Sequence, residues 1–435
     1  MCIYKSWGLK LFKGVEDIME EVYSKTELEK IPNGWQVRKF SDVIEKIVGG
    51  GTPSRKIPQY FYGDIPWATV KDLDNSFYKY DTIEHISLDA VENSATNVIN
   101  SNKIIIATRM GLGRGFINKV PMAINQDLKG IYLKDNMSTE FLMFWYLYNR
   151  SNIEMMGKGS TVKGIRQEEL KEMPILVPPL KEQQKIADIL SIVDEQIEQT
   201  DALIEKTKEL KKGLMQRLLT KGIGHTDFKK TEVGEIPVEW EVKKLGEVTE
   251  IISGGTPNTK VEEYWRNGDI CWATPTDITS SGKYIRKTEK HITEKGLKNS
   301  SANLLPIGSI LMTSRATIGE RCINTVPMAT NQGFKSFICR EQVILNEFLY
   351  YLIEIIKPIF IRLAGGSTFL EISKKQVEEQ KIQVPPIEEQ KKIAFILSVI
   401  DIKLEDYQTK KQKLQTLKRG LMQKLLTGKI RVKVS

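Results

Sequence analysis

Few side chains in this sequence have the type and spacing that enzyme chemistry requires. The three histidines, His85, His225 and His291, lie too far apart to form a site together, and we expect them to be structural. The four cysteines form neither the paired motif of a zinc site nor a disulfide framework; they are Cys2, Cys271, Cys322 and Cys339. The sequence therefore predicts no metal site, and such sparse cysteines are typical of the reducing cytoplasm.

Three short motifs resemble parts of enzyme sites but depart from them at decisive positions. Residues 177–180 read Val-Pro-Pro-Leu and lack the polar first residue of the Asp/Asn-Pro-Pro-Tyr/Phe tetrapeptide of amino-methyltransferases. Residues 111–115 do not have the GxGxxG spacing before a helix, so we expect a turn there. Residues 157–161 resemble the end of a P-loop, but Asn152 stands where the first glycine belongs. We therefore expect this chain to catalyse no reaction.

The remaining polar candidates suit recognition rather than catalysis. Arg109 and Arg315 each follow a predicted buried strand, and Asn125-Gln126 and Asn331-Gln332 each follow another. Arginine can bond bidentately to guanine, and asparagine or glutamine can do so to adenine. The same side chains can instead contact phosphates or form hydrogen bonds within the protein.

These residues recur because the chain repeats itself after about 205 residues. The matched segments are 31–35 and 236–240, 49–53 and 254–257, 63–69 and 268–274, 120–126 and 326–332, 177–183 and 384–390, and 213–215 and 420–422. The offset changes only from 204 to 207, and so long a period indicates a duplicated half rather than a solenoid. Two halves that read different sequences should differ where they contact bases. The recurring arginines and amides are therefore expected to position phosphates or to bond internally.

Each half begins with a segment of about 150 residues that mixes strands and helices. Lys103–Ala107 and Ser309–Met312 are apolar runs typical of buried strands, and Glu140–Met156 and Asn346–Leu363 carry apolar residues at helical spacing. The sequence therefore predicts two domains of α/β class (mixed α+β). We expect four tryptophans in or beside their cores, namely Trp35, Trp67, Trp240 and Trp272.

A long charged segment without proline follows Pro178-Pro179 in the first half and Pro385-Pro386 in the second. Proline suits the first turn of a helix, and apolar residues then alternate at spacings of four and three, as in a coiled coil. The seam residues are Ile186, Leu190, Val193, Ile197, Ile204, Leu214 and Leu218 in one helix, and Ile393, Leu397, Ile400, Leu404, Tyr407, Leu414, Leu421 and Leu425 in the other. About 40 residues make a helix roughly 60 Å long. We expect the two helices to pair antiparallel about a pseudo-twofold axis; the alternative is that each packs only on its own domain.

These patterns divide the chain into six parts: an N-terminal extension (1–30), a first α/β domain (31–178), a central helix (179–222), a linker (223–235), a second α/β domain (236–385), and a C-terminal helix with its tail (386–435). Lysine and arginine number 64 against 55 acidic residues, a net charge of +9 that permits a polyanionic partner. No apolar stretch is long enough to span a membrane, and the charged N-terminus does not resemble a signal peptide. We therefore expect a cytoplasmic protein that binds no membrane.

Taken together, the motifs resemble the specificity (S) subunit of type I restriction-modification systems. The resemblance rests on Gly-Gly-Thr-Pro, Gly-x-Ile-x-Trp, Pro-Pro-x-x-Glu-Gln-x-x-Ile and Gly-Leu-Met-Gln-x-Leu-Leu-Thr, and it covers residues 25–434 in both halves. It implies that each α/β domain is a target recognition domain that reads one half of a bipartite, asymmetric site in double-stranded DNA. It also implies that the helices set the unread spacer and dock two methyltransferase (M) subunits, to which two restriction (R) subunits can add.

The family methylates adenine N6 with S-adenosylmethionine, but that cofactor belongs to the M subunit. The resemblance therefore implies no cofactor and no enzyme activity in this chain, whereas the assembled complex would be a DNA methyltransferase and, with R subunits, an ATP-dependent endonuclease that defends against foreign DNA. One alternative is a stand-alone or regulatory bipartite DNA-binding protein without an M subunit. Another is a coiled-coil scaffold that binds only proteins, which would leave the basic, loop-rich domains unexplained.

Two interpretations are open for the glycine loops, residues 49–53 and 254–257. Glycine permits close backbone approach, so each loop is a tight strand connection, a loop that lies against DNA, or both. In the second case the donors would come from Gly50, Thr52, Gly255 and Thr256.

Base-reading residues are expected in loops where the two halves differ. In the first half the candidates are Ser54, Arg55, Lys71, Arg114, Asp127, Lys163 and Arg166. In the second half they are Asn258, Lys260, Thr276, Thr317, Gly333 and Glu371, with Thr368 in the loop that follows the second helix. Charge alone would equally fit a solvated surface.

Overall fold

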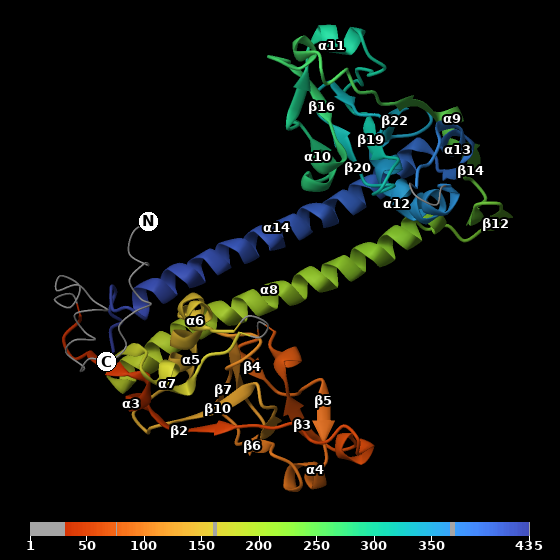
Figure 1. The fold of residues 1–435 in the computed structure, drawn as a ribbon. Helices are drawn as coiled ribbons and strands as arrows, with labels where there is room; N and C mark the ends of the chain where they lie inside the picture. Colours follow the sequence, from red (N-terminus) through yellow and green to blue (C-terminus); the bar gives the residue numbers. More distant parts are fainter. Residues whose placement is uncertain (1–30, 75, 160–162, 366–369, 435) are drawn as a thin grey trace. The chain divides into compact units, whose positions relative to one another are not determined.

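The computed structural model describes residues 31–434 with the exception of residues 75, 160–162 and 366–369. The chain divides into two compact units. Unit 1 comprises Met1–Asp201 and Thr409–Ser435, and unit 2 comprises Ala202–Gln408. Each unit therefore holds one α/β domain together with the beginning of one long helix and the end of the other (Figure 1).

Unit 1 is built on two β-sheets. The five-stranded sheet has the order β2-β10-β7-β8-β4, with strands Ile44–Gly49, Leu128–Leu133, Ile104–Ala107, Gly115–Asn118 and Tyr78–Lys79. The four-stranded sheet has the order β5-β3-β9-β6, with strands Glu84–Ile86, Ile65–Ala68, Met122–Ile124 and Asn97–Ile99. A separate antiparallel pair joins β1 and β11, which are Gln36–Lys39 and Pro174–Val177. The α-helices before the long helix are α3, α4, α5, α6 and α7, at Phe40–Val43, Leu88–Glu92, Thr139–Tyr148, Arg150–Met156 and Gln167–Lys171.

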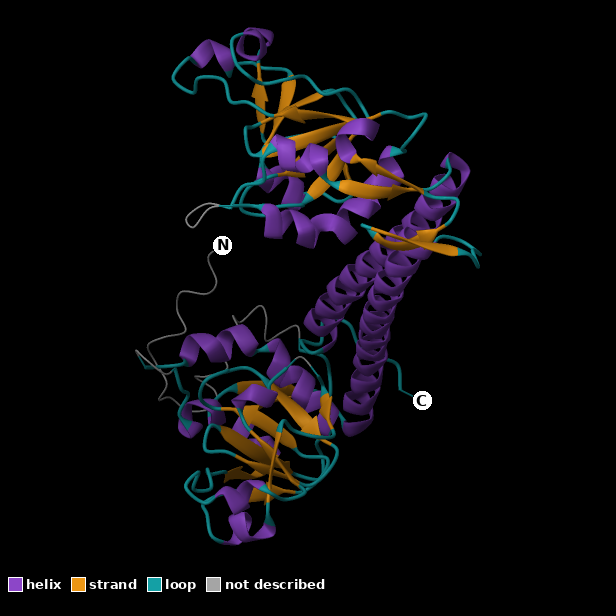
Figure 2. Cartoon of the chain, turned by 90° about the vertical axis from the view of Figure 1, so that its right-hand side faces the viewer, coloured by secondary structure: helices purple, strands orange, loops and turns teal. Residues whose placement is uncertain are grey.

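Unit 2 repeats this plan. The order β15-β22-β19-β20-β17 comprises Thr249–Ser253, Phe334–Cys339, Ile310–Thr313, Arg321–Asn324 and Tyr284–Ile285, and the order β18-β16-β21 comprises Lys290–Ile292, Ile270–Ala273 and Met328–Thr330. The pair β14 and β23 is Glu241–Lys244 with Lys381–Val384. The helices are α9, α10, α11, α12 and α13, at Leu245–Val248, Pro275–Ser280, Glu294–Lys298, Asn346–Leu363 and Lys374–Glu379. In each unit the strands lie between groups of helices (Figure 2).

The apolar strands are buried because each contributes to two cores. In β7, Ile104 and Ile106 pack with α5, while Ile105 and Ala107 pack between the two sheets of unit 1. Successive side chains of a strand point to opposite faces, so a strand covered on both faces is a continuous apolar run. The predicted strands and the four buried tryptophans are confirmed, with Trp35, Trp67, Trp240 and Trp272 all less than 9% exposed.

The Glu-Gln pair of the Pro-Pro-x-x-Glu-Gln motif joins each long helix to its domain. Gln183 accepts a hydrogen bond from the Ser138 N–H (2.9 Å) and donates to the carbonyl of Pro178 (2.9 Å). Gln390 accepts from the Leu345 N–H (2.9 Å) and donates to Pro385 (2.8 Å) in the same way. Both glutamines are buried, so these bonds fix the angle at which the helix leaves the domain.

The glutamates of the motif contact residues that follow the end of the other long helix. In unit 1, Glu182 accepts the indole N–H of Trp35 (3.0 Å) and pairs with Arg431. In unit 2, Glu389 accepts the indole N–H of Trp240 (2.9 Å) and contacts His225 (2.9 Å). His225 is thus structural, as expected.

The long helices are α8 (Leu180–Lys221) and α14 (Ile387–Leu425). Within unit 1, Lys418 pairs with Asp194 and Lys411 with Asp201, each at 2.5 Å. Within unit 2, Lys211 pairs with Asp401 at 2.6 Å. In all three pairs the two residue numbers add to 612, so the same antiparallel register holds in both units. The predicted antiparallel pairing is confirmed.

The alternative that each helix packs on its own domain is also partly realised. Ile186 and Leu190 of α8 share the core of unit 1 with Met422 and Leu425 of α14.

The apolar seam is interrupted at Lys211 and Lys418, which occupy seam positions in the seven-residue spacing. Each lysine pairs with an aspartate of the other helix. A polar residue at a seam position specifies register at a cost in stability.

Two expected elements differ in the structure. The predicted helix Glu140–Met156 is two helices, α5 and α6, because the chain turns at Asn149, where ψ is 9° and the side-chain amide donates to the Trp145 carbonyl (2.9 Å). Such local side-chain bonds compete with helical ones. The segment expected to be a linker, 223–235, belongs largely to a hairpin of β12 (Phe228–Thr231) and β13 (Gly234–Pro237).

Candidate nucleic-acid interface

The glycine loops need glycine because they pass close to the backbone of their own unit. A Cβ at Gly50 would lie 2.1 Å from the carbonyl oxygen of Ile124, and one at Gly255 would lie 2.3 Å from the Ala302 nitrogen. The carbonyl of Gly51 also accepts the indole N–H of Trp67 (3.3 Å). The structure therefore accounts for the glycines as tight connections, and contact with phosphate stays a prediction.

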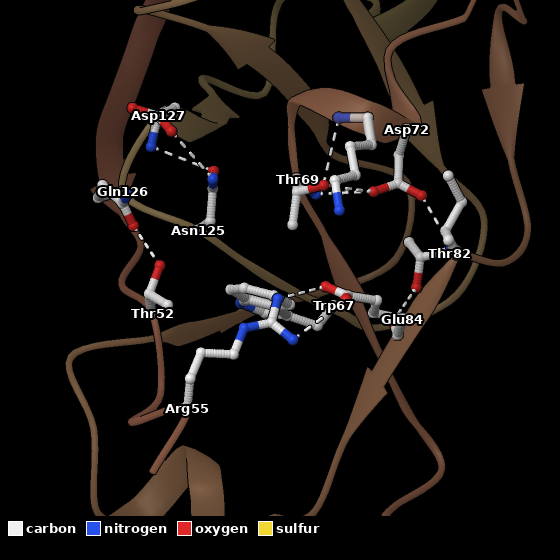
Figure 3. Close-up of polar contacts among 12 residues, drawn as sticks. Thr52, Arg55, Trp67, Thr69, Asp72, Thr82, Glu84, Asn125, Gln126 and Asp127 are labelled. Carbon is white, nitrogen blue, oxygen red and sulfur yellow. Dashed lines mark hydrogen bonds and ion pairs between the residues drawn. The ribbon is translucent and has the colours of Figure 1, made fainter. Parts of the chain in front are cut away.

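The threonines of both loops hold a glutamine from the neighbouring strand connection. The Thr52 hydroxyl donates to the side-chain carbonyl of Gln126 (Figure 3), and the Thr256 hydroxyl donates to that of Gln332. Both glutamines are exposed. The repeated Thr-Gln bond fixes the two amides on the surface, where they could meet a ligand.

The asparagines that precede these glutamines shape turns instead. Asn125 is buried; its side-chain NH₂ donates to the Asp127 carboxylate (3.1 Å), and its side-chain oxygen accepts the backbone N–H of Asp127 (3.1 Å). Asn331 accepts the backbone N–H of Gly333 (2.9 Å) at the same point of unit 2. For the asparagines, the expected internal hydrogen bonding is what the structure shows.

Arg109 and Arg315 lie at the tips of matched hairpins, with side chains 54% and 46% exposed. The Arg109 Nε is 3.8 Å from Asp127, and the Arg315 Nε is 2.9 Å from Glu371. Both arginines also form isolated backbone bridges, Arg109 to Gly164 and Arg315 to Glu371. Each guanidinium is therefore both exposed and oriented by a carboxylate.

A second cluster of unit 1 surrounds Glu84. Arg55 pairs with Glu84 through two bonds of 3.1 and 2.7 Å (Figure 3). The Arg55 guanidinium also stacks 4.1 Å from the centre of the Phe61 ring. The hydrogen bond from Arg55 holds the pKa of the Glu84 carboxyl below its usual value, and Lys71 acts in the same direction. An open pocket of ≈ 400 Å³ beside this cluster is lined by Arg55, Phe61, Tyr62, Gly63, Ile83, Glu84 and His85.

The Lys71 loop is held by the side chain of Asp72. This carboxylate accepts the backbone N–H groups of Thr69 and Ile83, each at 2.8 Å (Figure 3 shows the Asp72 group). Asp277 accepts from Thr274 (2.8 Å) and Glu289 (2.9 Å) in the same way. The buried carboxylates thus support two turns that expose Lys71 in unit 1 and Thr276 in unit 2.

Contacts connect many of the expected site residues into one path in each unit, which passes through the buried Asp127 and Gly333. In unit 1 they run from Thr52 through Gln126 and Asp127 to Arg109, whose neighbour Met110 donates its N–H to the Lys163 carbonyl (3.3 Å). In unit 2 the matching path runs from Thr256 through Gln332 and Gly333 to Arg315 and Glu371.

The other candidates are exposed without joining this path through a described contact; they are Ser54, Arg114, Arg166, Asn258, Lys260 and Thr317. Arg114 shares the hairpin tip of Arg109 through a bond from its N–H to the Gly111 carbonyl (3.1 Å), and Arg166 is the N-cap residue of α7. Thr368 lies outside the described residues.

The sequence did not point to Glu84 or to Lys335. Lys335 is only 6% exposed and lies 3.8 Å from Glu371, and burial lowers its pKa despite that carboxylate. A lysine in an apolar strand gives no periodic signal that distinguishes burial from exposure. Glu84 lies opposite Trp67 on a paired strand, and this strand register is visible only in the structure.

Over the described ranges, no cluster of three or more histidine, cysteine, aspartate or glutamate side chains has a geometry that could hold a metal ion. In the same part of the chain, every helix is too short or too polar to cross a membrane.

Comparison with known proteins places the repeat in a family. Residues 32–209 and 237–417 match the family described as "Type I restriction modification DNA specificity domain". The chain belongs to this specificity family. It is 31% identical to the putative type I restriction enzyme MjaX specificity subunit of Methanocaldococcus jannaschii, over 95% of this chain and 98% of that one. It is 30% identical to the MjaVIII specificity subunit of the same organism, over 95% and 97% of the two chains.

A solved S subunit from M. genitalium shares the fold of this specificity chain. The two structures match with a TM-score of 0.59 over 93% of this chain and 98% of the other, at 18% identity. A structure from work on the assembly of a type I system matches with a TM-score of 0.56 over 92% and 99% of the chains, also at 18% identity.

Proposed function

We propose that this specificity chain reads a bipartite, asymmetric site in double-stranded DNA, with one target recognition domain on each half-site. The chain catalyses nothing itself. It docks two M subunits, which bring S-adenosylmethionine and methylate adenine N6, and two R subunits can join to make an ATP-dependent endonuclease. The assembled complex acts in the cytoplasm, where it protects the host from foreign DNA.

The observation that carries this proposal is the pairing of one scaffold with different exposed side chains. Both units keep the Thr-Gln bond, the asparagine turn and the buried carboxylate that supports the next turn. The exposed side chains on that scaffold differ. Glu84 pairs with Trp67 in unit 1, and Lys290 pairs with the matching Trp272 in unit 2, so a lysine stands in unit 2 where unit 1 has a glutamate. Two copies of one frame with different surface chemistry suit two different half-sites.

The helices support the proposed role as a spacer. The constant register of the Asp-Lys pairs leaves one way for α8 and α14 to align within each unit. A fixed register makes helix length, rather than sliding, the variable that would determine the distance between half-sites.

Methylome sequencing of a host that carries this chain with its M subunit tests the proposal. We expect methylated adenines within one bipartite motif that has a constant unread spacer. The purified chain alone should transfer no methyl group to DNA, and methylation by the isolated chain would overturn the non-catalytic role. Failure to co-purify with an M subunit, with DNA binding retained, would favour a stand-alone regulator.

A further inference from the structure

The matched arginines of the two units take their carboxylate partner from different places. Arg109 is next to Asp127, which precedes β10, whereas Arg315 bonds to Glu371, which precedes α13. The backbone around both arginines is the same, because each forms its isolated bridge with the matching segment. Matched arginines in matched hairpins are therefore held by carboxylates from different segments of the chain.

The two carboxylate positions are exchanged between the units. The side-chain carbonyl of Asn125 accepts the backbone N–H of Asp127 in unit 1, and that of Asn331 accepts the backbone N–H of Gly333 in unit 2, so these positions correspond. The bridges to the arginines show that Gly164 corresponds to Glu371. Each unit thus keeps one carboxylate and one glycine, in opposite places.

A carboxylate determines how a guanidinium faces its surroundings, because the planar fork has a fixed set of N–H directions. In both units the Nε edge is turned toward the carboxylate, and about half of the side chain is exposed. A carboxylate that comes from a different segment can therefore turn the outward edge of the fork in a different direction. Each carboxylate is less exposed than its arginine, so the pair can orient the arginine while the outer part of the guanidinium stays accessible to DNA.

We propose that Arg109 and Arg315 each read a base of their half-site, and that Asp127 and Glu371 are positioning residues that determine which base is reached. This inference rests on the proposed function. It reverses the expectation from the sequence, where the identity of the two arginines argued against base reading. Lys335 lies 3.8 Å from Glu371 and helps to hold the carboxylate of unit 2 in place.

The test moves the carboxylate of unit 1 to its place in unit 2 with the double substitution Asp127→Gly and Gly164→Glu. Position 164 can take a side chain, because a Cβ there would lie 3.3 Å from the flexible Arg109 side chain and 3.4 Å from the Thr108 carbonyl. The complex with its M subunit then methylates a DNA library in which both half-sites are randomised. We expect preference in the first half-site to change by about tenfold or more at one base position, with the second half-site unchanged.

The reverse exchange in unit 2, Gly333→Asp with Glu371→Gly, is an independent copy of the experiment. A Cβ at position 333 would lie 3.1 Å from the Asn331 side-chain oxygen and 4.0 Å from the Arg315 side chain. Here the second half-site should change and the first should stay. The single variant Asp127→Gly frees Arg109 and should relax the preference at the same position.

Unchanged base preferences in both exchanges, or weaker methylation without any change of preference, would overturn the inference and leave the carboxylates with a purely structural role. Retention of the untouched half-site shows that the variant has folded and assembled. An unmodified complex that shows no bipartite preference at all would instead contradict the proposed function.

Discussion

Lengthening both long helices by one heptad should lengthen the unread spacer without changing either half-site. We place the insertions after Asp201 in α8 and after Gln408 in α14, at the boundary between the two units. The three Asp-Lys pairs then stay intact within their units. An insertion after Thr200 would instead move Asp201 away from Lys411.

The expected size of the change follows from helix geometry. Seven residues lengthen a helix by roughly 10 Å, which corresponds to about 3 bp at 3.4 Å each. Three base pairs rotate the far half-site by roughly 100°, since a turn takes about 10.5 bp. The heptad rotates the protein by only about 20°. Activity is therefore expected to fall, and the accepted increment should settle at roughly 1–3 bp.

The assay is methylation of a library in which the spacer between the half-sites takes every length. A heptad in α8 alone is the matched control, because the registers of the two units then differ by seven residues and the Asp194–Lys418 and Lys211–Asp401 pairs cannot both form. That variant should lose activity on all spacers. An active variant with both insertions that keeps the parental spacer would refute the idea that the helices measure the distance.

Two further predictions concern the candidate interface. Gly51→Ala should lower the free energy of unfolding by about 1–3 kcal/mol, since the new Cβ would lie 2.5 Å from the Ala95 backbone. The control Gly213→Ala in α8 places its Cβ within 4 Å of no other atom, and it should raise the free energy of unfolding by about 0.5–1 kcal/mol. Equal effects of the two substitutions in denaturant titrations would contradict the close approach at Gly51. The Arg55 bond, which lowers the pKa of Glu84, stabilises the fold above the usual glutamate pKa and is lost as pH falls through the lowered value. Because Arg55 is 55% exposed, Glu84→Gln should remove less than about 1 kcal/mol of acid-side pH dependence, and an unchanged pH profile would show that the pair contributes nothing.

Much of the architecture follows from the sequence because it depends on local and repeated patterns. The apolar runs around Ile105 and Leu311 predict buried strands, and the seams from Ile186 and Ile393 predict the long helices. The repeat then requires two similar units. The apolar spacing continues across Asn149 and so does not reveal the break there, which depends on the local bond to Trp145.

The candidate site is harder to predict from the sequence because its contacts join residues that lie far apart in the chain. Asp127 and Glu371 could be identified as divergent and polar, but their partnership with the arginines depends on hairpin and loop placement. Thr52 and Gln126 illustrate the same limit, as they are repeated in both halves yet bonded across two strand connections. The internal repeat identifies the residues that the two units share, but it does not show which of their atoms are in contact.

Exchange of residues 31–178 for the corresponding segment of a relative tests the central claim most directly. The hybrid chain, assembled with its M subunit, should methylate a motif in which one half-site has changed and the other half-site and the spacer are kept. This outcome is expected because unit 2 and both long helices are untouched. A motif in which both half-sites change, or in which neither changes, would contradict the account of two separate recognition domains.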